Sequence, residues 1–238
     1  MIPKIIHFCW FGRGEMPELA LQCIESWHKV MPDWKYILWN EDNFDISSYP
    51  YAQEAYDAKK YAFVSDVARL FALKEYGGVY FDVDFEVYKP FDDLLQNEAF
   101  AGFEGSKTNP IMMGVLGSVQ NGNWVSWQLE QYQDRHFFAD GLPDTTTNVR
   151  FITDLMIKRG FLPNGQEQDC MDLHVYPVDY FCPRQTTGEY IRTNHTYCEH
   201  LGIGSWSDHG SSWKSRLLSM MSPFLRVMII KIKRKIFG

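Results

Sequence analysis

Two aspartates that stand two positions apart, Asp82 and Asp84 in the stretch GGVYFDVD, are the residues best suited to chemistry. In a β-strand alternate side chains project from one face, which predicts the two residues about 7 Å apart at their backbones. Their carboxylates repel each other unless a cation compensates the charge. A divalent ion held by one or both could bridge two phosphates of a nucleotide sugar and offset charge on the leaving group. A structural calcium site or a solvated turn is the alternative interpretation.

A second candidate pair lies shortly before the aspartates, where Asp66 and Arg69 follow Ser65. Residues three positions apart share one face of a helix, so these two side chains are predicted to meet. An acid and a base beside an acidic metal site can bind sugar hydroxyls, which both donate and accept hydrogen bonds. The alternative is a surface ion pair, which contributes little to stability.

The third candidate is the late segment HLGIGSW, which begins with His200. Imidazole is a suitable ligand for manganese beside carboxylates. The two glycines allow close backbone approach, and Ser205 and Trp206 can donate hydrogen bonds to phosphate oxygens. A single histidine is also common on a surface or in a core, so that interpretation stays open.

The elements that must position these residues begin with a βαβ unit. Residues 4–10 predict a buried strand, residues 17–30 a helix and residues 34–39 a second strand. A strand, a helix and a strand at this spacing favour parallel pairing.

The aspartates themselves are expected on a strand that follows a long helix. Residues 52–75 predict one continuous helix with an apolar face, ended by two glycines. Residues 79–87 predict a single strand that brings both acids to its carboxyl end, where ligands bind in open α/β sheets. The remaining predicted elements are a strand at 111–119, helices at 124–132 and 148–159, and short strands and loops at 165–213.

Length and composition fit one soluble α/β domain. The chain has 238 residues, of which 45% are hydrophobic and 22% charged. A net charge of -7 argues against a nucleic-acid binder, which needs a basic surface. Five cysteines without a CxxC spacing favour a reduced, cytosolic setting. The first residues are too short and polar for a signal peptide, and no apolar run has the length of a membrane span.

Three stretches, IPKIIHFCWFG, SDVARLFALKEYGGVYFDVDF and HLGIGSW, resemble glycosyltransferase family 32, which includes capsular polysaccharide transferases and fungal Golgi mannosyltransferases. They are also similar to the catalytic domain of the large glucosylating bacterial toxins. The resemblance implies a single GT-A type (Rossmann-like) nucleotide-sugar-binding domain over residues 1–212, with a mostly parallel central sheet. The middle stretch carries this resemblance best, because its Ser-Asp, Arg, Gly-Gly, Tyr and Asp-Val-Asp occur in the order and spacing of the family.

The resemblance carries roles for named residues. It implies that Trp10 stacks on the nucleotide base, that Asp66 and Arg69 contact the donor sugar, and that Asp82 contacts the ribose or the metal. These residues and the next aspartate form the implied catalytic set of Asp66, Arg69, Asp82 and Asp84.

The same resemblance implies a metal and diphosphate site. Asp84 is the principal metal ligand, Asp82 a second one, and His200 completes the shell, while Ser205 and Trp206 bind the diphosphate. The expected cofactor is Mn2+ or Mg2+.

The implied reaction is transfer of a hexose, with retention of configuration, from a nucleotide-diphosphate sugar, favoured as a UDP-sugar by analogy. The implied acceptor is a saccharide or a lipid-linked saccharide in surface or capsular polysaccharide synthesis. The main contribution of the protein would be electrostatic stabilisation of the leaving diphosphate. A phosphatase of the haloacid dehalogenase type and a non-catalytic sugar-binding module are the alternatives. Four polar residues are candidates for the acceptor side, or for ordinary loop chemistry: Asn109, Asp144, Thr147 and Asn148.

The end of the chain, residues 213–238, has a composition of its own. No acid follows Asp208, whereas seven basic residues do. The apolar members of one helical stripe are Leu225, Met228, Ile229, Ile232 and Ile236. This pattern predicts a basic amphipathic helix on an anionic membrane surface, and hence a location at the cytosolic face of a membrane. Packing of this helix against the catalytic domain or a partner is the alternative.

Overall fold

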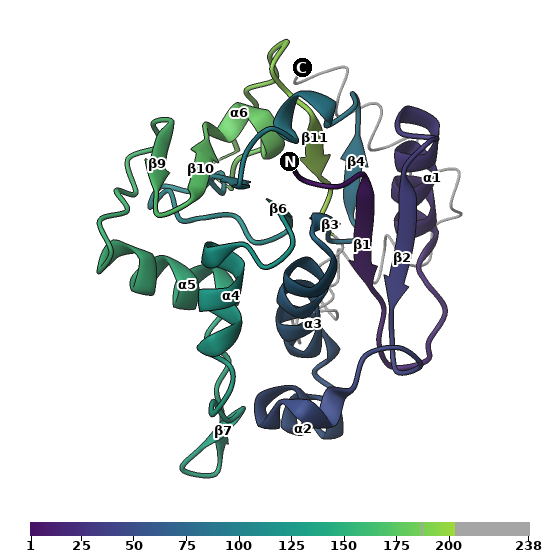
Figure 1. Cartoon of the computed structure of the whole chain (residues 1–238), viewed down its shortest axis with the longest axis vertical. Helices are drawn as coiled ribbons and strands as arrows, with labels where there is room; N and C mark the ends of the chain where they lie inside the picture. Colours follow the sequence, from purple (N-terminus) through teal and green to yellow (C-terminus); the bar gives the residue numbers. More distant parts are fainter. Residues whose placement is uncertain (187, 203–238) are drawn as a thin grey trace. The chain divides into compact units, whose positions relative to one another are not determined.

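The computed structural model describes residues 1–186 and 188–202, shown in colour in Figure 1. The expected diphosphate ligands Ser205 and Trp206, the boundary after residue 212 and the basic segment 213–238 lie outside the described residues. Those expectations therefore stay predictions.

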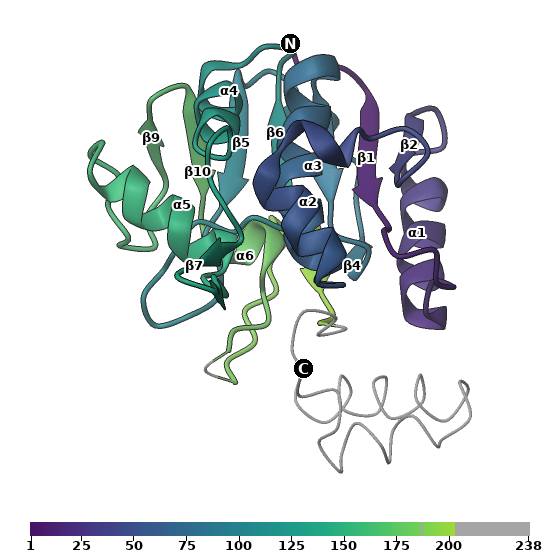
Figure 2. The same cartoon turned by 90° about the horizontal axis from the view of Figure 1, so that it is seen from below.

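A seven-stranded sheet forms the centre of the unit Met1–Leu201, in the order β2-β1-β3-β6-β5-β10-β9. Figure 2 shows this order across the sheet, from β9 at one side to β2 at the other. Strands β1, β2, β3, β5 and β10 point the same way, and β6 and β9 are antiparallel to their neighbours. The predicted α/β architecture with a mostly parallel sheet is confirmed. The strands are β1 (Ile5–Cys9), β2 (Lys35–Trp39), β3 (Gly78–Phe81), β5 (Ala99–Gly102), β6 (Val115–Ser118), β9 (Gln168–Cys170) and β10 (Leu173–Tyr176).

The other described elements surround this sheet. The helices are α1 (Glu18–Val30), η1 (Ile46–Ser48), α2 (Pro50–Asp57), α3 (Tyr61–Tyr76), η2 (Asp92–Leu94), α4 (Asn123–Glu130), α5 (Asn148–Ile157) and α6 (Val178–Phe181). The short strands β4 (Phe85–Val87) and β11 (Cys198–His200) pair with each other, as do β7 (Phe138–Ala139) and β8 (Leu142–Pro143). The predicted βαβ unit is confirmed as β1, α1 and β2, with β1 and β2 parallel.

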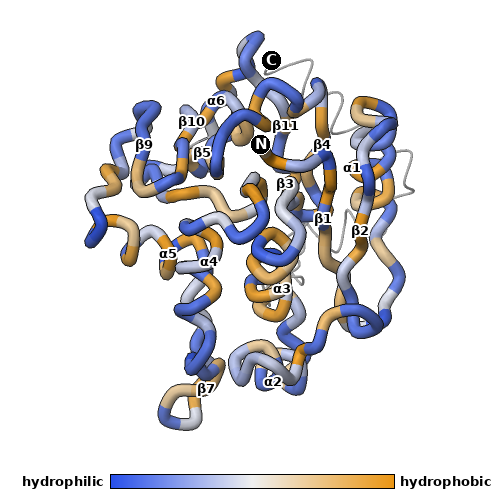
Figure 3. The backbone as a smooth tube through the Cα atoms, in the orientation of Figure 1, coloured by the Kyte–Doolittle hydropathy of each residue, from blue (hydrophilic) through white to orange (hydrophobic). Residues whose placement is uncertain are grey.

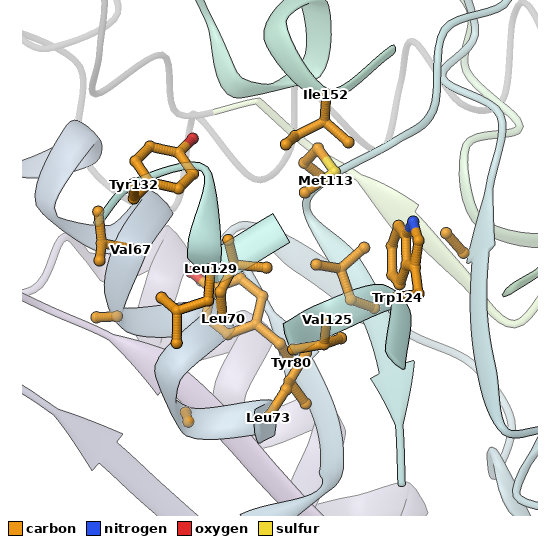
Figure 4. Packing of buried hydrophobic residues seen from close by; sticks show 14 of the residues in the cluster. Val67, Leu70, Leu73, Tyr80, Met113, Trp124, Val125, Leu129, Tyr132 and Ile152 are labelled. Carbon is orange, nitrogen blue, oxygen red and sulfur yellow. The ribbon is translucent and has the colours of Figure 1, made fainter. Parts of the chain in front are cut away.

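Two clusters of buried side chains stabilise the sheet. The first joins α2, α3, α4 and α5 to the strands, and the second contains residues of α1, β4 and α6. Figure 3 shows that α3 is hydrophobic over most of its length. In Figure 4, Val67 and Leu70 of α3 lie beside Leu129 and Tyr132, which come from α4 and the turn after it. Helix α3 is therefore a core element that can hold polar side chains in place.

The prediction of one helix over 52–75 is wrong, because two helices, α2 and α3, cover this region. Helix α2 starts earlier, with Pro50 at its first turn, a position where the missing N–H of proline costs nothing. Lys59 then takes a positive φ of 58°, which an α-helix cannot continue. The chain thus turns between the two helices before α3 begins at Tyr61.

The prediction of a single strand over 79–87 is also wrong. Strand β3 ends at Phe81, and the backbone N–H of Phe85 donates to the carbonyl of Asp82 at 3.2 Å, which closes a turn. Strand β4 then leaves the main sheet and pairs with β11. The two acids, Asp82 and Asp84, therefore belong to a turn at the end of β3 and do not share a face of one strand.

His7 of β1 links three segments inside the core and is completely buried. Its Nδ1 accepts a hydrogen bond from the indole N–H of Trp39 at 3.0 Å, so its Nε2 carries the proton and donates to the carbonyl of Gly77 at 2.8 Å. A second proton, on Nδ1, would point at the N–H of Trp39, so the charged form of the imidazole is disfavoured here. Burial, together with the charge of Lys35, lowers the pKa of His7 to about 4, against the raising effect of Gly77.

We expect the stability of the protein to fall as the pH decreases from 6.5 towards 4. The unfolded chain binds a proton at His7 near pH 6.5, whereas the folded protein does so only near pH 4. Stability from the neutral imidazole is thus complete above the unfolded pKa and decreases below it. Between pH 7 and pH 4.5 this linkage amounts to about 2 kcal/mol, measurable by urea unfolding at the two values.

The control is the variant His7→Gln, whose amide can accept from Trp39 and donate to Gly77 without titrating. This variant is expected to lose about 2 kcal/mol less than the wild type over the same pH interval. An equal loss in both proteins would contradict the assignment to His7.

Candidate active site

The carboxyl ends of the parallel strands meet at one edge of the sheet, which is where ligands bind in open α/β sheets. Trp10 follows β1, Asp82 follows β3 and Glu104 lies two residues after β5. Strand β6 runs the other way, so Met113 and Gly114, which precede it, also lie at this edge. The backbone N–H of Asp82 donates to the carbonyl of Gly114 at 2.8 Å and extends the pairing of β3 with β6 by one bond.

A buried ionic cluster joins α3 to this edge. Arg69 and Asp66 are 4% and 7% exposed, so they are not the surface ion pair considered from the sequence. Arg69 Nη2 lies 2.9 Å from Asp66 Oδ1 and 3.3 Å from Asp82 Oδ1. Tyr80 donates its hydroxyl hydrogen bond to the same Asp82 oxygen at 2.8 Å, and Arg69 Nη1 donates to the carbonyl of Met113. Three predicted residues, Asp66, Arg69 and Asp82, are thus brought together.

The cluster changes the proton affinity of both acids. Burial raises the pKa of Asp66 to about 7, although the charge of Arg69 acts in the opposite direction. Burial also raises the pKa of Asp82, as does the neighbouring charge of Asp84, while Arg69 lowers it. Asp66 can therefore accept or donate a hydrogen bond near neutral pH, which suits recognition of a hydroxyl group.

Asp84 and His200, separated by 115 residues in the sequence, meet in space. His200 Nε2 lies 3.1 Å from Asp84 Oδ2, and the backbone N–H of Leu201 donates to the carbonyl of Asp84 at 2.8 Å. The imidazole stacks on the ring of Phe85 at 4.7 Å between centroids, because His200 of β11 pairs with Phe85 of β4. Burial alone would lower the pKa of His200, but the hydrogen bond and charge of Asp84 raise it.

In the described part of the chain, the expected metal ligands Asp82 and Asp84 contact different partners. Asp84 faces His200, whereas Asp82 faces Arg69 and Tyr80. Within residues 1–186 and 188–202, no group of three His, Cys, Asp or Glu side chains is arranged to hold a metal ion. A carboxylate oxygen beside an imidazole nitrogen is nevertheless a donor set that suits manganese. Asp84 and His200 thus fit a metal that takes its other ligands from a substrate or from water.

Other residues of this edge were not predicted from the sequence. A Cβ on Gly114 would lie 2.6 Å from the Phe85 ring and 2.9 Å from Asp82 Oδ2, so only glycine leaves room for the acidic turn. Glu104 is near enough for its charge to act on His200 and Asp82, and burial raises its own pKa. Neither residue belongs to a spaced motif, and only the ends of β5 and β6 would have indicated them.

The remaining predicted residues occupy separate places. The indole N–H of Trp10 donates to the carbonyl of Gly14 at 2.6 Å, with the side chain partly buried at the end of β1. Its stacking on a base stays a prediction. Of the acceptor-side candidates, Thr147 caps α5 by accepting from the N–H of Arg150, and Asn109 has a positive φ of 43° in a loop.

A segment in the first half of the chain matches a family model. Residues 17–101 match the model described as "Glycosyltransferase sugar-binding region containing DXD motif". This segment contains Asp66, Arg69, Asp82 and Asp84. The resemblance to Asp-x-Asp sugar transferases expected from the sequence is confirmed.

Several curated relatives are sugar transferases by name. Inositol phosphoceramide mannosyltransferase 3 of Schizosaccharomyces pombe is 36% identical over 122 residues, which are 49% of this chain and 33% of that protein. An uncharacterized glycosyltransferase of Acanthamoeba polyphaga mimivirus is 26% identical over 88% of this chain and 85% of its own length. The chain spans about one third of the length of the fungal mannosyltransferases it matches. These names agree with the expected enzyme class.

Among solved structures, PaToxG Glycosyltransferase has a TM-score of 0.43 at 18% identity, covering 54% of this chain and 59% of that chain. An active-site mutant of LgtC has a TM-score of 0.43 at 13% identity, covering 92% of this chain and 97% of that chain.

Proposed function

We propose that this chain is a retaining, metal-dependent glycosyltransferase of the GT-A type, which moves a hexose from a nucleotide-diphosphate sugar to a saccharide or lipid-linked acceptor. The observation that carries this proposal is the turn at Asp82–Asp84. One of its acids is joined to a buried Arg69–Asp66 pair and the other to His200, at the ligand-binding edge of the sheet. The match of residues 17–101 to a sugar-binding region supports it.

In this proposal one group of described residues binds the metal and diphosphate, and another binds the donor sugar. Asp84 and His200 would hold Mn2+ or Mg2+, with Asp82 beside them. When bound, the cation would offset the charge that develops on the leaving diphosphate. Arg69 fixes Asp82 and Asp66 by direct contacts. Asp66 and Arg69 would bind hydroxyl groups of the donor sugar, for which their donors and acceptors are suited.

The nucleotide would be bound by residues at both ends of the chain. Trp10 would stack on the base, and Ser205 and Trp206 would donate hydrogen bonds to the diphosphate. We favour a uridine nucleotide, and the names of the fungal relatives make mannose a sugar to include in any screen.

A membrane-bound acceptor would suit this enzyme. The related fungal proteins are named for inositol phosphoceramide, which is a lipid. None of the helices in the described ranges has the length and hydropathy needed to cross a bilayer. We propose that the basic segment 213–238 binds an anionic membrane surface at the cytosolic face, where a lipid-linked acceptor for surface polysaccharide would be available.

A thermal-shift screen of nucleotide sugars with and without Mn2+ tests the proposed function. A specific ligand at one hundred times its Kd stabilises the folded state by about 2.7 kcal/mol, which corresponds to a rise in Tm of about 5 °C or more. We expect such a rise with at least one nucleotide sugar, and only when Mn2+ is present. Release of phosphate from p-nitrophenyl phosphate, without any response to nucleotide sugars, would favour the phosphatase and contradict the proposal.

A further inference from the structure

Glu199 of β11 is an acid that the surrounding side chains enclose completely. Its side chain is 0% exposed, and both of its oxygens accept hydrogen bonds. Arg184 Nε donates to Oε1 at 2.8 Å, and the hydroxyls of Tyr88 and Tyr190 donate to Oε2 at 2.9 Å and 3.0 Å. A buried carboxylate is costly unless such partners compensate it. The three donors therefore fix Glu199 in one place.

The strand that carries this acid is short and lies outside the seven-stranded sheet. Within the described residues β11 pairs with β4, and each strand has three residues (Figure 1). A two-stranded pair of this size is marginal by itself. Glu199 adds one attachment to Tyr88, directly after β4, and another to Arg184 and Tyr190, which form an antiparallel bridge with each other. It thus joins β11 to two other segments of the chain.

His200, the next residue, faces the candidate active site. Successive side chains of a strand point to opposite faces, so Glu199 and His200 lie on the two faces of the β4–β11 pair. On its own face, His200 stacks on Phe85 and lies 3.1 Å from Asp84. Glu199 can therefore act on the Asp84–His200 pair by setting the position of β11.

We propose that Glu199 is a positioning residue that holds the His200 imidazole beside Asp84 for metal binding. This inference rests on the proposed function and adds a residue that does not itself bind the metal. Two ligands that are held in place in advance bind an ion more tightly, because less conformational freedom is lost on binding. Replacing a residue that orients a metal ligand typically weakens metal binding by about 10- to 100-fold.

The test variant is Glu199→Gln, which has nearly the same size. Its amide keeps one acceptor oxygen but places N–H donors where Glu199 has its second oxygen, so part of the donor set loses its acceptor. We expect β11 to be held less firmly while the seven-stranded sheet stays folded. Glu189→Gln is the matched control, because it removes the same charge from an exposed side chain a few residues before β11.

The measurement is Mn2+ binding in the presence of UDP, followed by electron paramagnetic resonance. We expect Glu199→Gln to bind Mn2+ about 10-fold more weakly than the wild type, and Glu189→Gln to bind it as tightly as the wild type. The spin echo of the bound ion also detects a coordinated imidazole nitrogen, and this signal should weaken in Glu199→Gln. Equal affinity and an equal nitrogen signal in a folded Glu199→Gln would overturn the inference while leaving the proposed function intact. A wild-type protein that binds no Mn2+ with UDP would overturn both.

A second background separates positioning of His200 from a general loss of structure. In His200→Ala the imidazole is absent, so adding Glu199→Gln is expected to change Mn2+ affinity by less than about twofold. A further loss of about 10-fold in this background would overturn the inference, because Glu199 would then act without His200. If Glu199→Gln does not fold, Tyr190→Phe replaces it, since this variant removes one donor to Glu199 and keeps the ring beside Arg184. Unchanged Mn2+ affinity in Tyr190→Phe would then overturn the inference.

Discussion

Replacing Asp84 by asparagine is expected to lower the rate of sugar transfer by about 100- to 1,000-fold, the range seen when one preorganised stabilising group is removed from an active site. Asn has the same shape as Asp, and the contact with His200 can persist through its amide oxygen. The variant therefore removes the negative charge of the Asp84 carboxylate and keeps the shape of the side chain. The measurements are kcat and KM for the preferred donor over a range of Mn2+ concentrations.

The matched control for this variant is Asp154→Asn. Asp154 forms an exposed pair with Arg150 in α5, and its loss should leave transfer unchanged. Thermal unfolding of each variant separates a catalytic loss from a folding loss. Transfer by Asp84→Asn within threefold of the wild type, in a folded protein, would contradict the role given to Asp84.

The Arg69→Met variant is expected to lose about 3–5 kcal/mol of unfolding free energy, the usual cost of removing one partner from a buried ion pair. Arg69 contacts two carboxylates and the carbonyl of Met113, and all three would lose the interaction with Arg69, although Asp82 would keep the hydrogen bond from Tyr80. The variant would leave Asp66 and Asp82 close together without a compensating charge. Urea unfolding followed by circular dichroism gives the change in stability.

A double variant makes this prediction sharper. In Arg69→Met with Asp66→Asn one of the uncompensated acids is neutral, so part of the lost stability should return. The surface control Arg150→Met removes an exposed, 3.7 Å pair and should change stability by less than about 0.5 kcal/mol. A loss below about 1 kcal/mol in Arg69→Met would show that the buried cluster is not a stabilising centre.

Local patterns predicted much of the sheet and part of the site. The apolar run at residues 4–10 and the alternation at residues 34–39 located β1 and β2 to within one residue at each end. The contact between Asp66 and Arg69 followed from their spacing, because residues three apart share a helix face whatever surrounds them. Their deep burial did not, since it depends on how α3 packs against the strands.

Such local patterns could not predict contacts between segments that are far apart in the sequence. The break after Phe81 arises because β4 pairs with β11, and no local feature of GGVYFDVDFEV shows that partner. In the sequence Gly114 looks like an ordinary loop glycine. Only the structure shows that the Asp82 turn packs against it and leaves no room for a side chain.

Electron paramagnetic resonance of Mn2+ during titration with the protein and UDP tests most directly whether the acidic turn binds a metal–diphosphate complex. We expect one Mn2+ bound per chain when UDP is present, much weaker binding without UDP, and loss of this site in Asp84→Asn. Free Mn2+ that stays unchanged with UDP, or binding that is equal in the wild type and Asp84→Asn, would show that this turn is not the metal site of a glycosyltransferase.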